Sequence, residues 1–71
     1  MEKIIINTPD IQLDQFLKWA GVVESGGQVK ILIEAGIIMV NGQLATQKRK
    51  KLIPGDVVSI QEEGTWLVAA E

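Results

Sequence analysis

The spacing of hydrophobic residues changes from helical to strand-like close to residue 36, and this change constrains the fold more than any other feature of the chain. Before it, an apolar stripe with i, i+3, i+4 and i+7 spacing runs through Leu13, Phe16, Leu17 and Ala20. This spacing places the side chains on one face of an amphipathic helix. Gly21 is expected to end that helix.

A second helix is predicted over residues 25–36. Ser25 and Gln28 have the spacing of a capping box, in which each side chain satisfies a free backbone N–H of the other residue. The apolar stripe of this helix is predicted at Val29, Leu32 and Ile33. Ile31 falls on the opposite face, where no burial is expected.

Beyond residue 36 the chain consists of short apolar runs joined by turn signals. Asn41-Gly42 lies between two such runs and predicts a hairpin, because both positions of its turn need a positive φ angle. Pro54-Gly55 fits a type II turn. Strands are expected around residues 37–40, 43–45, 56–61 and 65–69, after a first strand at residues 2–7.

The predicted order is strand, helix, helix and about four further strands, without the long crossovers of a β–α–β unit. This order indicates an α+β fold in which two helices pack on a small antiparallel sheet of about four to five strands. With 71 residues, the chain is expected to form a single domain over residues 1–71, because so short a chain supports only one small core.

The composition argues against catalytic and metal sites. The chain has no cysteine and no histidine, which excludes disulfides, thiolate ligands and the usual proton shuttle. Its carboxylates are scattered at surface-like spacings, so we expect no catalytic residue, no metal ligands and no cofactor. Residues 1–10 contain only three consecutive isoleucines, too few for a signal peptide or a membrane span, and a cytoplasmic protein is expected.

The positive charge is concentrated in one stretch, the basic segment of residues 48–51, which consists of Lys48, Arg49, Lys50 and Lys51. Residues 44–53 carry +4 and no carboxylate, whereas the rest of the chain carries +3 and −9, a net −6. A run of like charges usually lies in a solvated loop. Because this run has no acidic neighbour in the sequence, binding to a polyanion is the better interpretation.

Several blocks of the sequence match a known pattern in order and spacing: LDQFLK at residues 13–18, Ser25, LIEAGIIMVNG at 32–42 and PGDVVSI at 54–60. They resemble the S-four-like, or alpha-L, RNA-binding domain, which is named after small-subunit ribosomal protein four. The resemblance implies a two-helix alpha-L motif that holds structured RNA, mostly ribosomal or transfer RNA, across the helical face and adjoining loops. It also implies a stand-alone RNA-binding protein, and some stand-alone relatives associate with ribosomal particles.

The resemblance makes Lys18 and Lys30 candidate RNA contacts beside the basic segment. Each lysine also has a simpler explanation as half of a helical salt bridge, since Asp14 lies four residues before Lys18 and Glu34 four residues after Lys30. Both interpretations stay open at this point.

Two positions depart from the family pattern, because Gln12 and Gly26 stand where the family often has arginine. We expect backbone N–H groups of Ser25, Gly26 and Gly27 to replace part of the missing phosphate contact, since a helix N-terminus suits an anion. A flexible helix start is the competing interpretation for these three residues. Gln12 is retained as a candidate RNA contact.

Trp19 lies beside the apolar stripe of the first helix, on the side of Gln12 and Gln15. Packing at the edge of the core is favoured for it over stacking on a nucleobase. Trp66 is expected on a strand and partly buried.

Two other functions compete with RNA binding. The first is a protein-interaction module that uses Ile31 and a sheet edge, with the basic segment docking an acidic partner. The second is a sulfur carrier of the small ubiquitin-like type, which requires a C-terminal Gly-Gly, whereas this chain ends in Ala69-Ala70-Glu71.

The sequence therefore predicts a non-catalytic protein that binds RNA, with ribosomal RNA or a ribosomal particle as the favoured partner, and acts in ribosome assembly or function. No membrane partner and no small-molecule substrate are expected. A monomer is predicted.

Overall fold

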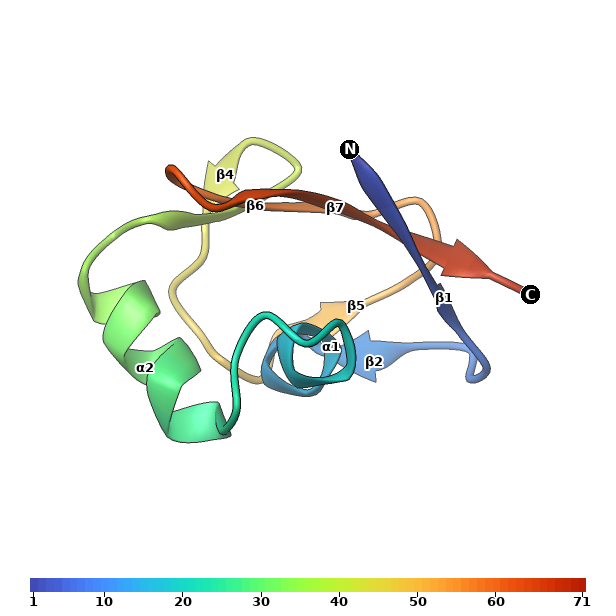
Figure 1. Cartoon of the computed structure of the whole chain (residues 1–71), viewed down its shortest axis with the longest axis horizontal. Coiled ribbons are helices and arrows are strands. Elements are labelled where there is room, and N and C mark those ends of the chain that lie inside the picture. The colour runs from blue at the N-terminus through green and yellow to red at the C-terminus, as the bar shows by residue number, and fades with distance from the viewer.

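The computed structural model describes residues 1–71. In chain order its elements are β1 (Glu2–Ile6), β2 (Ile11–Gln12), α1 (Leu13–Trp19), α2 (Gly26–Glu34), β3 (Ile38–Val40), β4 (Gln43–Leu44), β5 (Lys51–Leu52), β6 (Val57–Ile60) and β7 (Gly64–Ala70). One layer is a five-stranded sheet in the order β1-β7-β6-β3-β4, and the other contains both helices and the two-stranded sheet β2-β5 (Figure 1). This arrangement confirms the predicted α+β fold.

The large sheet is mixed, whereas the sequence predicted an antiparallel one. The pairs β3–β4, β3–β6 and β6–β7 are antiparallel, as expected. Strand β1 joins in parallel, with Glu2 opposite Trp66 and Ile6 opposite Ala70. A parallel pair needs a long connection, and here the helices and all the other strands provide it.

The small sheet β2-β5 is a further departure from the prediction, which placed no strand at either position. Ile11 pairs with Leu52, and Gln12 pairs with Lys51. Strands of two residues show no periodic pattern in a sequence, so this pairing is visible only in the folded chain.

The space between the layers is filled by hydrophobic side chains alone. The stripe predicted for α1 is confirmed, since Leu13, Phe16 and Leu17 are all 0% exposed. In α2, Val29 is buried and the other two stripe residues are partly buried, whereas Ile31 is 66% exposed, as predicted. Each fully buried side chain of this size stabilises the fold by about 1.5–3 kcal/mol relative to an exposed one.

The two turns and the helix cap that the sequence predicts are present in the structure. Asn41 and Gly42 have φ angles of 53° and 81°, which is the conformation that the hairpin signal requires. Gly55 has a positive φ angle of 102°. At the start of α2, the Gln28 Oε1 atom accepts a hydrogen bond from the Ser25 N–H at 3.2 Å, so the capping box orders this helix end.

Asn41 also links the β3–β4 turn to the loop before β6. Its side-chain amide donates to Asp56 Oδ1 at 2.9 Å, and its Oδ1 atom accepts from the Val57 N–H at 2.9 Å. The other oxygen of Asp56 accepts from the Ile53 N–H at 2.9 Å. These bonds join two turns that lie well apart in the sequence. Their side chains come from the Asn-Gly and Pro-Gly-Asp turn motifs.

Two substitutions at Asn41 separate the contribution of its backbone conformation to stability from that of its side-chain hydrogen bonds. Asn41→Gly keeps the positive φ angle but removes two side-chain hydrogen bonds, and we expect a loss of about 1–3 kcal/mol in the free energy of unfolding. Asn41→Ala should lose about 1 kcal/mol more, because a side chain with Cβ is strained in the left-handed region. Urea denaturation measures both values. Equal stability of the two variants would contradict the conformational part, and a Gly variant as stable as the original chain would contradict the hydrogen-bond part.

Candidate functional site

The basic segment lies against the N-terminus of α1. The Leu13 N–H donates to the Lys50 carbonyl at 2.8 Å, and the Asp14 N–H donates to the Lys48 carbonyl at 2.8 Å. The first N–H groups of a helix have no acceptor within the helix, and Gln12, at the N-cap position, makes no side-chain capping bond. Backbone carbonyls of the basic segment therefore cap α1.

The pairing of β2 with β5 adds a second contact between the basic segment and the chain that leads into α1. Gln12 lies opposite Lys51, and both residues are exposed. A cation thus stands directly beside the position where the resembled family often has arginine. The fold brings Gln12 and the basic segment, two separate candidates from the sequence, into one surface.

The side chains of the basic segment extend from this anchored backbone. Arg49, Lys50 and Lys51 are exposed, and Lys48 is half-buried. The side-chain hydrogen bonds of the protein involve none of the four cations. The segment therefore presents its charge on a backbone that the helix holds in place.

Lys30 is the helical lysine that the structure brings to the basic segment. Lys30 and Lys48 line one hollow of about 310 Å³, together with Ile33, Glu34 and Thr46. Glu34 shares the hollow, but Lys30 donates no hydrogen bond to it. This hollow joins α2 to the surface formed by the basic segment.

Lys18 lies at the far end of α1 from the basic segment. It is exposed and belongs to the last turn of the helix. A helix of seven residues is about 9 Å long between its terminal Cα atoms. The structure therefore does not place Lys18 with the other cations, and it donates no hydrogen bond to Asp14.

The start of α2 has an acidic neighbour that the sequence did not reveal. One oxygen of Asp14, Oδ2, lies 3.5 Å from the point that a Cβ atom on Gly26 would occupy, and the other accepts from the Gln15 N–H at 2.9 Å. A negative charge near a helix N-terminus is stabilising. A phosphate at Ser25, Gly26 and Gly27 would share this position with the Asp14 carboxylate, and the expected contact there stays a prediction.

Trp19 is the exposed residue that sequence reasoning misjudged. Its side chain is 62% exposed, so the expectation that it packs at the core edge is wrong. The signal was its position on the same side of the helix as Gln12 and Gln15, away from the apolar stripe. Trp66, by contrast, is 7% exposed and lies in the core.

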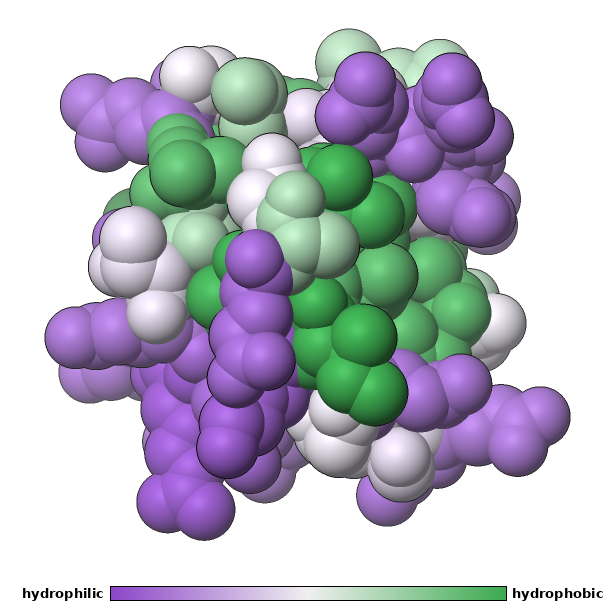
Figure 2. All heavy atoms as spheres, turned by 90° about the vertical axis from the view of Figure 1, so that its left-hand side faces the viewer, coloured by the Kyte–Doolittle hydropathy of each residue, from purple (hydrophilic) through white to green (hydrophobic).

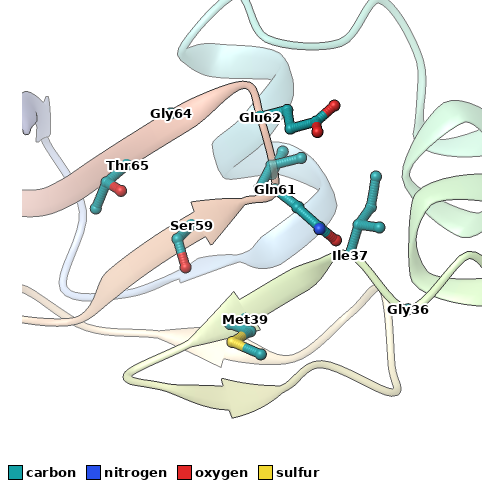
Figure 3. Close-up of a pocket in the computed structure, with 9 residues that line it drawn as sticks. Gly36, Ile37, Met39, Ser59, Gln61, Glu62, Gly64 and Thr65 are labelled. Carbon is teal, nitrogen blue, oxygen red and sulfur yellow. The ribbon is translucent and has the colours of Figure 1, made fainter.

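Two hollows lie near the β6–β7 turn, and each is lined by one carboxylate. A hollow of about 530 Å³ lies between the α2–β3 connection and the β6–β7 turn. Ile37, Gln61 and Glu62 are among the residues that line it (Figure 3). A second hollow of about 280 Å³ beside it is mostly apolar and includes Ile31 and Glu63. Neither hollow is lined by lysine or arginine. Figure 2 shows a continuous hydrophobic area, bordered by hydrophilic residues, on the face that carries α2.

No group of three or more acidic, histidine or cysteine side chains is close enough together to hold a metal ion. Neither helix has the length and hydrophobicity that a membrane crossing demands.

The chain is similar to a protein family and to two bacterial proteins. A family model described as "S4 domain" matches residues 4–68. A Bacillus subtilis (strain 168) protein, "Probable ribosome maturation protein RlbA", is 40% identical over 65 residues, which make up 92% of this chain and 92% of that protein. An Escherichia coli (strain K12) protein, "Putative RNA-binding protein YbcJ", is 39% identical over 61 residues, which make up 86% of this chain and 87% of that protein.

Hydrogen exchange tests whether the basic segment caps α1. The amides of Leu13 and Asp14 should exchange about tenfold or more slowly than those of Gly26 and Gly27, which hold equivalent positions in α2 but have no acceptor in the structure. Exchange measured by nuclear magnetic resonance, corrected for intrinsic rates, gives the comparison. Equal protection at the two helix starts would contradict the anchoring of the basic segment.

Proposed function

Because the chain belongs to the S4 domain family, we propose that it is a non-catalytic RNA-binding protein that binds structured ribosomal RNA and acts in ribosome assembly or function. The names of two relatives, one a ribosome maturation protein and the other an RNA-binding protein, support this proposal. It acts in the cytoplasm as a monomeric domain over residues 1–71, without a small-molecule substrate or a membrane partner.

The observation that carries the proposal is the anchoring of the basic segment on the N-terminus of α1. Four consecutive cations extend from a backbone fixed by two hydrogen bonds of 2.8 Å. Each phosphate that such a surface neutralises releases counterions from the RNA, which drives association.

The proposed contacts fall into three groups. The cations that neutralise phosphates are Lys48, Arg49, Lys50, Lys51, Lys30 and Lys18. The amide of Gln12 lies beside Lys51 and forms hydrogen bonds to the RNA. Backbone N–H groups at Ser25, Gly26 and Gly27 supply the third group, next to the Asp14 carboxylate.

Replacing all four residues of the basic segment by alanine tests the proposal. The substitution removes the cations but keeps the carbonyls that cap α1, so the fold should persist. We expect loss of binding to a ribosomal RNA fragment. The slope of log affinity against log salt concentration should also flatten by about 3, since four contacts are lost. Filter binding across a salt series measures both effects.

A matched control carries the same change in charge elsewhere. Lys3→Glu, Gln61→Glu and Ala70→Glu together lower the net charge by 2 + 1 + 1 = 4, as the alanine variant does, and all three positions are exposed. This control should bind RNA much more tightly than the alanine variant. Equal binding by the two variants, or unchanged binding by the alanine variant, would favour the alternative in which the basic segment docks an acidic protein.

Gly26→Arg tests whether the departure from the family pattern limits affinity. The Asp14 carboxylate lies within van der Waals distance of a Cβ at this position, so an arginine fits beside it and offsets its charge. We expect RNA affinity to rise severalfold, since one more cation faces the phosphates. Gly26→Gln adds a similar side chain without charge and serves as the control in the same binding assay. Equal affinities of the two variants would show that the start of α2 does not face RNA.

A further inference from the structure

Trp19 is the most exposed aromatic side chain of the protein. It is 62% exposed, whereas Phe16 is 0% and Trp66 is 7% exposed. Leaving the large apolar faces of an indole in water gives up stabilisation that burial would supply. The fold buries the other two aromatic side chains, so the exposure of Trp19 needs a separate explanation.

The indole of Trp19 is held in one position. Its N–H donates to the carbonyl of Ile5 at 3.0 Å, which fastens the end of α1 to strand β1. β1 is an edge strand of the large sheet, so this bond also covers part of a free strand edge. A ring fixed in this way loses little conformational entropy when a planar ligand stacks on it.

Trp19 belongs to a stripe that begins at the basic segment. Gln15 and Trp19 are spaced i and i+4, so they lie on the same side of α1; Gln12 directly precedes the helix, and all three residues are exposed. The stripe starts opposite Lys51, and Lys18 flanks its far end. Asp14, the acidic residue of α1, is turned toward the start of α2 instead.

We propose that Trp19 is the stacking site for an unpaired nucleobase of the RNA whose phosphates bind the basic segment. This inference rests on the proposed RNA-binding function. A strand that leaves the basic segment passes Gln15, whose amide can donate and accept hydrogen bonds. It reaches Trp19 about 9 Å from the first residue of α1. The recognised feature is an unpaired base in a loop or bulge, because bases within a duplex do not expose their faces.

The test uses two RNA hairpins and two variants. The hairpins share one stem, and the loop holds either unpaired adenines or abasic nucleotides, so the phosphates are the same in both. Trp19→Leu and Trp19→Phe both lose the bond to Ile5, but only phenylalanine keeps an aromatic face. A difference between the two variants therefore reports stacking and not the loss of the hydrogen bond.

Trp19→Leu should weaken binding to the adenine-loop hairpin by about five- to one-hundred-fold and leave binding to the abasic-loop hairpin unchanged. Trp19→Phe should retain most of the affinity. In the original chain, tryptophan fluorescence should be quenched by the adenine loop alone. Trp66 is buried and supplies a constant background, which the Trp19→Phe variant measures.

Other outcomes overturn the inference in distinguishable ways. If Trp19→Leu binds both hairpins as the original chain does, while the alanine variant of the basic segment binds neither, RNA binding stands and Trp19 faces another partner, such as a protein. Equal losses on both hairpins would show that Trp19 acts through the fold. If the original chain binds neither these hairpins nor a ribosomal RNA fragment, the proposed function fails, and the stacking site fails with it.

Discussion

The capping of α1 by the basic segment couples the fold of this protein to its proposed function. Two carbonyl groups accept the N–H groups of Leu13 and Asp14 at 2.8 Å, and β2 pairs with β5 directly beside them. The contacts that order the start of α1 therefore also fix the backbone of the basic segment, which carries the proposed phosphate contacts.

The charge of the chain is unevenly distributed, as the proposed RNA contact requires. The basic segment and Lys30 lie at one side, whereas the hollows around the β6–β7 turn contain Glu62 and Glu63 and no cation. Outside residues 44–53 the net charge is −6, which keeps a polyanion away from the rest of the surface. A net charge of −2 for the whole chain therefore conceals one strongly basic segment in an otherwise acidic chain.

The parts of the structure that local patterns determine were predictable from the sequence. The apolar stripe of α1, the capping box at Ser25 and the turn at Asn41 each follow from residues a few positions apart. The parallel pairing of β1 with β7 was not predictable, because its partners lie at opposite ends of the chain. The helical wheel places Trp19 off the apolar stripe, but whether a neighbouring element covers it depends on tertiary packing, which the wheel does not contain.

The pairing of Gln12 with Lys51 gives a physical account of how this chain departs from its family. The family often has arginine at position 12, where this chain has an uncharged amide. Two-residue strands set the register that places Lys51 opposite Gln12, so a cationic residue from a different part of the chain lies beside this position. Any change that shifts this register moves the cation away and removes the acceptors that cap α1. Selection for RNA binding and selection for a folded α1 would therefore act on the same few backbone contacts.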